Sequence, residues 1–149
     1  MGPESRETPY RVLVVERDPV LRIMLAGTLQ LRGHFVVTAA DTPTPLDLLD
    51  RLPFDLVIID VYAGRPVTCA AVRTLRRAMP NLTIIATCAG FRETGSEVAQ
   101  RIGVALGLDK PFLPDRLCDA VEQLLDRHAE NWKLIGAETA ALDHRVTRH

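Results

Sequence analysis

The sequence predicts an α/β fold with a doubly wound, five-stranded parallel sheet, and two observations lead to this prediction. Short, continuously apolar runs alternate with segments whose apolar residues recur every three or four positions, as strands followed by amphipathic helices do. Capping residues, prolines and glycines separate these segments. Because parallel strands need crossover connections, strands that alternate with helices build a sheet with helices on both faces.

The first two units each pair a strand with a capped helix. Residues 11–15 are rich in β-branched side chains and, after Arg11, continuously apolar, which is typical of a strand covered on both faces. Asp18-Pro19 then places a capping oxygen before a proline at the first helical position. Residues 35–38 form the second predicted strand, and Thr44-Pro45 repeats the cap-and-proline arrangement before a second predicted helix.

The third and fourth units follow the same order. Residues 55–59 are the most apolar run, and the helix after them is expected to stop before Pro80, which cannot continue it. Residues 82–86 are expected to form the fourth strand. Ser96 is expected to cap the following helix, and Gly103 to end it, because glycine suits the left-handed conformation found there.

The fifth unit consists of residues 104–108 and a helix that Pro114 opens. Its buried side is expected to comprise Leu117, Val121, Leu124 and Leu125. Spacings of four and three then continue beyond the domain, through Val121, Leu125, His128, Trp132, Ile135, Thr139, Leu142 and Val146. Such a seam is typical of a helix that packs against a partner helix, so we predict a helical extension that supports a homodimer, with Trp132 as its anchor. The alternative is a tail helix folded back on its own domain.

Composition fits one domain with additions at both ends. The chain has 149 residues, of which 25% are charged, and a formal net charge of −1. We expect residues 1–9 to be a flexible arm and residues 10–127 to form the domain. Residues 128–149 would be the C-terminal extension, which is too short to fold alone, so no further domain is expected.

Several functional classes are disfavoured. Near-neutral charge without basic runs argues against nucleic-acid binding, and no apolar stretch approaches the roughly 20 residues of a membrane-spanning helix. The N-terminus lacks the pattern of a secretory signal. The cysteines lie far apart without a C-x-x-C pair, so neither a zinc site nor a disulfide framework is indicated. We therefore expect a cytoplasmic protein that spans no membrane.

Charged side chains follow three of the predicted strands. Glu16-Arg17-Asp18 comes after the first, Asp60 after the third and Lys110 after the fifth. Because ligands bind outside the carboxyl ends of strands in open parallel sheets, we expect these groups to converge on one pocket. Arg17 stands where a metal-binding version of this pocket would have a second carboxylate.

Over the predicted domain the chain resembles the receiver domain of two-component response regulators. The matching segments are Val14-Val15-Glu16-Arg17-Asp18-Pro19, Leu56-Val57-Ile58-Ile59-Asp60, residues 80–88 and Lys110-Pro111-Phe112. The resemblance implies a flavodoxin-like fold in which Asp60 accepts a phosphoryl group from a sensor histidine kinase and Lys110 contacts that group. It also implies Mg²⁺ held by Glu16, Asp60 and the backbone carbonyl of Tyr62, with Asp18 as a substitute ligand.

Three positions depart from the pattern of this family. Its acid pair falls on Glu16 and Arg17, its switch Ser/Thr on Cys88 and its switch aromatic on Gly107. At ~4 Å and an effective dielectric of ~20, each unit charge pair is worth about 4 kcal/mol, so Arg17 is expected to weaken Mg²⁺ binding. Thr87 precedes Cys88, and we expect its hydroxyl to serve only after a one-residue slip of the strand.

Arg17 itself allows three interpretations. Its guanidinium could lie over the phosphoryl oxygens of a modified Asp60 and supply part of the charge of the metal, since arginine binds phosphate through two hydrogen bonds. It could instead pair with Glu16 or Asp60 and close the pocket. The third interpretation is a side chain that points to solvent.

The sequence therefore predicts a single-domain response regulator that accepts a phosphoryl group on Asp60 and signals through protein contacts, without being an enzyme beyond its own phosphorylation and dephosphorylation. The alternative is a pseudo-receiver that acts as a binding adaptor without phosphorylation. A nucleotide- or flavin-binding protein of similar topology is disfavoured, because the loop after the first strand lacks a glycine-rich phosphate cradle.

Overall fold

Five parallel strands form one sheet in the order β2-β1-β3-β4-β5. The computed structural model describes residues 9–41, 49, 51–61, 66–89 and 93–146, with the side chains of all of these except residues 66–68 and 137–146. The strands are β1 (Arg11–Val15), β2 (Phe35–Ala39), β3 (Leu56–Asp60), β4 (Thr83–Cys88) and β5 (Leu106–Asp109). Every pairing is parallel, so the strands end at one edge, and the order confirms the predicted flavodoxin-like fold.

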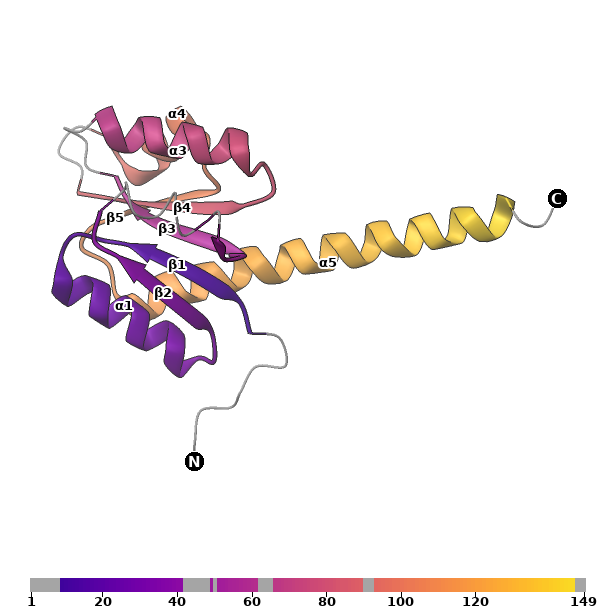
Figure 1. Ribbon diagram of the computed structural model, residues 1–149, viewed down its shortest axis with the longest axis horizontal. Coiled ribbons are helices and arrows are strands. Elements are labelled where there is room, and N and C mark those ends of the chain that lie inside the picture. The colour runs from indigo at the N-terminus through magenta and orange to yellow at the C-terminus, as the bar shows by residue number, and fades with distance from the viewer. Residues whose placement is uncertain (1–8, 42–48, 50, 62–65, 90–92, 147–149) are drawn as a thin grey trace.

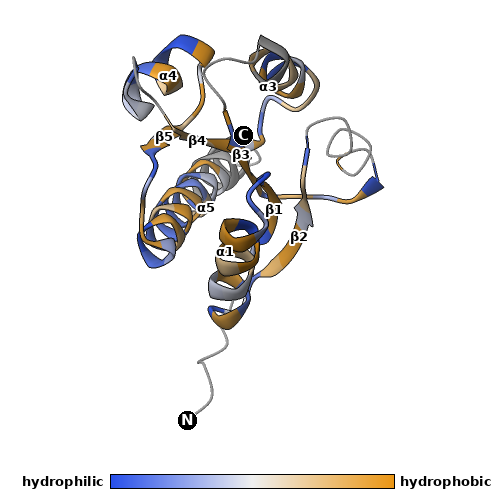
Figure 2. Ribbon diagram, turned by 90° about the vertical axis from the view of Figure 1, so that its left-hand side faces the viewer, coloured by the Kyte–Doolittle hydropathy of each residue, from blue (hydrophilic) through white to orange (hydrophobic). Residues whose placement is uncertain are grey.

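Among the described residues, two helices cover each face of the sheet (Figures 1 and 2). They are α1 (Pro19–Leu31) and α5 (Pro114–Val146) on one face, and α3 (Pro66–Ala78) and α4 (Gly95–Ile102) on the other. Alternate strand residues pack under α1 and α5, and the intervening residues pack under α3 and α4. Thr44-Pro45, where a second helix is predicted, lies outside the described residues.

Most helix ends match the local sequence signals. Asp18 caps α1, since its Oδ1 accepts hydrogen bonds from the backbone N–H groups of Val20 at 2.9 Å and Leu21 at 3.5 Å. Gly103 ends α4 with a φ of 72°, in the left-handed region that glycine favours. The prediction of Ser96 as the cap of α4 is wrong, because the helix begins two residues earlier and is capped by Thr94.

The early start of α4 follows from a contact between two glycines. Gly95, the first residue of α4, lies against Gly107 in β5, and a Cβ on Gly107 would stand 1.8 Å from the carbonyl oxygen of Gly95. The Gly95 N–H also donates to Asp109 Oδ1 at 2.8 Å. The first turn of α4 is therefore seated on the backbone of β5, at the position where the family pattern calls for an aromatic side chain.

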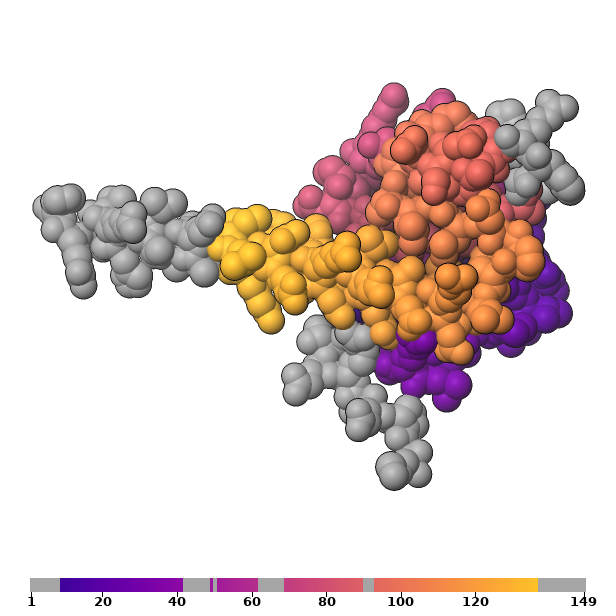
Figure 3. Space-filling model, turned by 180° about the vertical axis from the view of Figure 1, so that it is seen from behind, coloured from indigo at the N-terminus to yellow at the C-terminus, as the bar shows by residue number. Residues whose placement is uncertain are grey.

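The last helix continues well past the sheet. Leu117, Val121 and Leu125 of α5 are buried against the sheet, with Leu124 partly buried beside them, as predicted. Beyond them α5 projects from the domain (Figures 1 and 3). The predicted helical extension is confirmed, and the alternative of a tail folded back on its own domain is wrong for the described part of the chain.

Apolar side chains are exposed on the projecting part of α5. Trp132 is 56% exposed, and Leu134 and Ile135 are more than half exposed as well. The Trp132 Nε1–H donates to His128 Nε2 at 2.9 Å, which links two members of the predicted seam. None of the helices among the described residues combines the length and the apolar character that crossing a membrane requires.

Polar contacts fix the root of α5, the part around Asp119 and Glu122, to the domain. Arg32, directly after α1, donates from Nη1 to Asp119 Oδ1 at 2.7 Å. The buried imidazole of His34, directly before β2, lies with Nε2 3.0 Å from Glu122 Oε1. The His34 Nδ1 accepts the N–H of Tyr10 at 3.1 Å, so the proton of the neutral ring is on Nε2 and is donated to Glu122.

Candidate functional site

Three of the predicted charged groups meet at the carboxyl edge of the sheet. Glu16 follows β1, Asp60 ends β3 and Lys110 follows β5. The Lys110 Nζ lies 2.9 Å from Glu16 Oε2, 3.0 Å from Glu16 Oε1 and 3.1 Å from Asp60 Oδ1. The ammonium therefore bridges two carboxylates, and a group bound to Asp60 would lie within reach of Lys110.

Backbone hydrogen bonds extend the sheet just past these residues and hold them in place. The Glu16 N–H donates to the Ala39 carbonyl at 3.0 Å, and the Lys110 N–H donates to the Cys88 carbonyl at 2.8 Å. The Asp18 N–H donates to Glu16 Oε1 at 3.1 Å. Both oxygens of the Glu16 carboxylate are thus occupied by donors from within the domain.

Burial and charge shift the pKa values of this cluster. The Glu16 side chain is 2% exposed. Its burial and the negative charge of Asp60 raise the pKa of Glu16 above the usual 4.5, although the hydrogen bond from Lys110 acts in the opposite direction. Burial lowers the pKa of Lys110, but the hydrogen bond to Glu16 and the charge of Asp60 outweigh it, so this pKa is raised. Lys110 therefore remains an ammonium at neutral pH and compensates the two acids.

Arg17 pairs outside this cluster. Its Nη2 lies 3.8 Å from Oδ1 of Asp41, which follows β2, and both side chains are at least a third exposed. Because β1 lies between β2 and β3 in the sheet, this pairing directs Arg17 away from Asp60. Among the described residues the ion-pair partner of Arg17 is thus Asp41, and neither Glu16 nor Asp60 takes that role, contrary to the second interpretation.

Arg22, which sequence reasoning missed, fixes the loop that carries Glu16 and Arg17. From the first turns of α1 its Nη1 donates to the Glu16 carbonyl at 2.9 Å and to the Arg17 carbonyl at 3.4 Å. The signal was its position on the helix that directly follows this loop. These hydrogen bonds restrain the backbone of the loop but do not involve the side chain of Arg17.

Register places Thr87, rather than Cys88, beside Asp60. Asp60 pairs with Thr87 across β3 and β4, just as Ile58 pairs with Ile85 on the same face. In-register partners of parallel strands point to the same side, so Thr87 faces the Asp60 side without any slip of the strand. The expectation that a slip is needed is wrong, because it rested on spacing along the chain.

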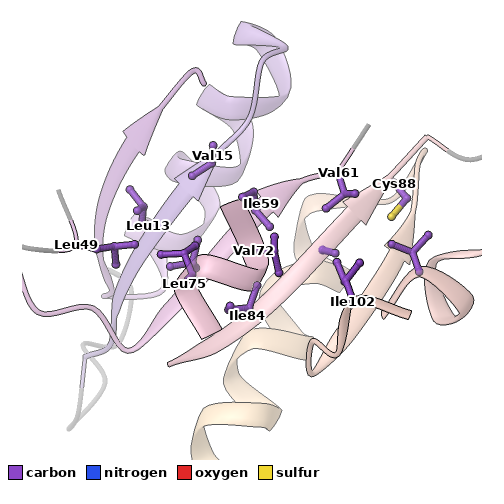
Figure 4. Close-up of a cluster of buried hydrophobic side chains, with 13 residues drawn as sticks. Leu13, Val15, Leu49, Ile59, Val61, Val72, Leu75, Ile84, Cys88 and Ile102 are labelled. Carbon is purple, nitrogen blue, oxygen red and sulfur yellow. The ribbon is translucent and has the colours of Figure 1, made fainter. Parts of the chain in front are cut away.

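Cys88 points to the opposite face. Its side chain packs with Val61 and Ile102 under α3 and α4, as Figure 4 shows. Burial raises the pKa of its thiol to about 11, so Cys88 is protonated and unreactive at neutral pH. The Thr87 hydroxyl, in contrast, is fully buried and finds no hydrogen-bond partner among the described residues.

The remaining predicted metal ligands are Asp18 and Tyr62. The Asp18 carboxylate caps α1, and Tyr62 lies outside the described residues. Mg²⁺ is usually bound through one or two carboxylates together with water molecules, and here the two carboxylates of the pocket share one ammonium. Within the described ranges, no three His, Cys, Asp or Glu side chains are grouped to hold a metal ion. Among the described residues, the predicted ligands Glu16, Asp60 and Asp18 are thus all engaged by donors of the protein itself.

Comparisons with known proteins agree with this geometry. A sequence profile described as "Response regulator receiver domain" matches residues 12–122. The probable transcriptional regulator ycf27 of Guillardia theta is 32% identical over 126 residues, which are 81% of this chain and 47% of that protein. The nisin biosynthesis regulatory protein NisR of Lactococcus lactis subsp. lactis is 23% identical over 82% of this chain and 53% of its own length. The chain thus spans about half the length of these curated relatives.

Solved structures share the fold. The receiver domain of the Francisella response regulator 1452 superposes with a TM-score of 0.70 at 23% identity, covering 80% of this chain and 98% of that one. The chemotaxis response regulator CheY4 of Vibrio cholerae gives a TM-score of 0.67 at 28% identity, over 78% of this chain and 98% of its own. Each similarity thus leaves about a fifth of this chain uncovered.

Proposed function

Because the chain belongs to the response regulator receiver domain family, we propose that its Asp60 accepts a phosphoryl group from a sensor histidine kinase and that the modified domain signals through protein contacts. The observation that carries this proposal is the bridge from Lys110 to Glu16 and Asp60. Receiver domains typically work in the cytoplasm and generally bind Mg²⁺, and the two carboxylates that would hold that ion here, Glu16 and Asp60, are bridged by Lys110.

The chemistry requires an acceptor oxygen and positive charge beside it. One oxygen of Asp60 attacks phosphorus, the P–N bond to the histidine of the kinase breaks, and its electron pair stays on the imidazole nitrogen. Lys110, 3.1 Å from Asp60 Oδ1, would bind the transferred oxygens and offset the negative charge that accumulates. Later attack by water would release inorganic phosphate and restore the Asp60 carboxylate.

Thr87 is the second contact that we propose for the phosphoryl group. Its hydroxyl lies on the Asp60 face, is buried and lacks a partner among the described residues. Leaving a buried hydroxyl unpaired costs about 1–3 kcal/mol, which a phosphoryl oxygen that accepts its hydrogen bond would recover. Cys88 has neither the orientation nor the hydrogen-bonding strength for this role.

The acceptor can be tested by weighing the intact protein after incubation with a partner kinase or a small phosphodonor. We expect one phosphoryl adduct in the wild type and none in Asp60→Asn. Thr87→Val should reduce the rate or yield of the adduct at least ~10-fold, the equivalent of one lost hydrogen bond to a charged group, whereas Cys88→Ala should not. The absence of any adduct with every donor would favour the alternative of a phosphorylation-independent adaptor.

That alternative is supported by one observation, the Gly95–Gly107 contact. Regulation in this family is expected to pass through an aromatic side chain in the fifth strand, and the seat of α4 on β5 leaves no room for one. A domain without this aromatic side chain could bind a partner protein in the same way whether or not it is phosphorylated. The adduct experiment separates the two functions.

We also propose that the projecting part of α5 supports a homodimer. The exposed Trp132 and Ile135 continue, at the same spacing, the stripe that Leu125 begins inside the domain. In proteins most of the stability of a helix comes from packing of its apolar face rather than from the helix alone. A second copy offers the same apolar seam at the same distance from its own domain.

Light scattering on the full chain tests this dimer. We expect twice the monomer mass for the wild type and the monomer mass for Trp132→Ala combined with Ile135→Ala. Lys133→Ala, which changes an exposed residue between them on the same helix, is the matched control and should remain dimeric. Equal masses for all three proteins would exclude this seam as the dimer contact.

A further inference from the structure

We propose that Arg17 replaces the divalent cation of this pocket, so that the domain excludes Mg²⁺ at rest and accepts its phosphoryl group without it. This inference rests on the function proposed above and concerns how the same site works. It assigns to Arg17 two alternating partners, Asp41 before phosphorylation and the phosphoryl oxygens afterwards.

The first support is the position that Lys110 already occupies. A divalent cation in this pocket would have to bind the oxygens of Glu16 and Asp60 that Lys110 now contacts at 2.9–3.1 Å. Both Glu16 oxygens are engaged by donors, and the residue is almost fully buried. A metal ion at those oxygens would therefore have to displace the ammonium from both carboxylates.

The second support is that the other nearby acids are engaged elsewhere. Asp18 uses its Oδ1 to cap α1, and Asp41 pairs with Arg17. The position after Glu16, which could have supplied a further carboxylate, adds a positive charge instead. Each of these features lowers the affinity for a divalent cation, and the charge of Arg17 also attracts an anion.

The third support is that the resting pair of Arg17 is weak enough to give way. Its Nη2–Oδ1 distance of 3.8 Å is beyond a direct hydrogen bond, and Arg17 and Asp41 are 36% and 56% exposed. Exposed pairs of this kind contribute little to stability. A phosphoryl group on Asp60 brings about two negative charges to the pocket, and a guanidinium binds two phosphoryl oxygens at once.

The backbone is arranged so that only a side chain needs to move. Arg22 holds the Glu16 and Arg17 carbonyls, so the loop keeps its path while the Arg17 side chain turns from the β2 side toward β3. Lys110 would then bind from the β5 side and Arg17 from the β1 side. The phosphoryl group would be held between two positive charges, one of them brought in by the turn of the Arg17 side chain.

A titration of the unphosphorylated protein with Mn²⁺ and Mg²⁺ tests the exclusion. Free Mn²⁺ is followed by its electron paramagnetic resonance signal, and Mg²⁺ by the shift in melting temperature. We expect no binding of either ion to the wild type at millimolar concentration, and binding of both to Arg17→Asp. Arg17→Gln, which removes the charge without adding a ligand, should bind at least 10-fold more weakly than Arg17→Asp.

Arg51→Asp is the matched control. It makes the same change of charge at an exposed residue that precedes β3, at the opposite edge of the sheet. It should leave the wild-type result unchanged. Binding of Mg²⁺ to the wild type as tight as to Arg17→Asp would overturn the proposal, and so would failure of Arg17→Asp to bind either ion while its far-ultraviolet circular dichroism stays that of the wild type.

A second experiment follows the phosphoryl adduct in excess chelator. We expect the wild type to form it with at least half of its rate in Mg²⁺, and Arg17→Gln to lose 10-fold or more in chelator. If the wild type forms the adduct only with Mg²⁺, the role of Arg17 is refuted while Asp60 remains the acceptor. If no adduct forms under any condition, phosphoacceptance fails, and the metal titration still decides whether Arg17 excludes the cation.

Discussion

A Gly107→Ala variant should lose ~3 kcal/mol or more of its free energy of unfolding, at the upper end of what overpacking costs. The added methyl group would stand 1.8 Å from the carbonyl oxygen of Gly95, and the next contact is again backbone, so no side chain can rotate to make room. Relief requires that α4 lift from β5, which also strains the bond from the Gly95 N–H to Asp109. Denaturant unfolding monitored by circular dichroism measures the loss.

Gly136→Ala is the matched control for that variant. Gly136 lies within α5, and no atom of the described residues lies within 4 Å of the place of its missing Cβ, so alanine there should stabilise the helix by up to ~1 kcal/mol. Opposite signs for the two glycines are therefore expected. An unchanged stability of Gly107→Ala would show that α4 does not rest on β5 as closely as described.

Replacing Lys110 with methionine should cost ~3 kcal/mol at pH 8 and far less at pH 5. Breaking a buried ion pair by removing one partner leaves an uncompensated charge, and here Glu16 and Asp60 would face each other without the ammonium. The pKa of Glu16 is already raised by burial and by Asp60, and loss of the hydrogen bond from Lys110 would raise it further. Equilibrium unfolding at several pH values measures the effect.

The sign of this pH dependence follows from the raised pKa. A carboxyl that holds its proton more tightly in the folded state than in the unfolded state contributes stability that is fully present below its unfolded pKa of about 4.5 and is lost as the pH rises through the higher folded pKa. Glu16→Gln in the Lys110→Met background should restore most of the stability at pH 8. Equal losses at pH 5 and pH 8 would contradict this explanation and indicate a packing defect.

The sequence predicted those features that depend on local chemistry or on topology alone. Asp18 and Gly103 were recognised because a cap and a left-handed glycine act within one turn of chain. The meeting of Asp60 and Lys110 was predicted because all strands of a parallel sheet end at one edge. Neither inference requires knowledge of how particular side chains pack.

The errors arose where the outcome depends on contacts between distant segments. Thr87 was placed away from Asp60 by spacing along the chain, whereas the register of β3 with β4 decides which side chains share a face. The cap of α4 was misplaced because the contact of Gly95 with Gly107 sets where that helix begins. Arg17 has Asp41 as its partner because β2 neighbours β1, a fact of sheet order that no local pattern contains.

The root of α5, held by Arg32 and His34, gives the helix the properties of a lever arm. Between Leu125 and Val146 the helix extends over ~31 Å at 1.5 Å per residue, so a tilt of ~5° at the root displaces the tip by ~3 Å. Small movements of α5 relative to α1 and β2 would thereby produce a displacement large enough to change how the projecting helices of two copies align. A change at the carboxyl edge of the sheet would then have its largest effect at the far end of α5, remote from Asp60.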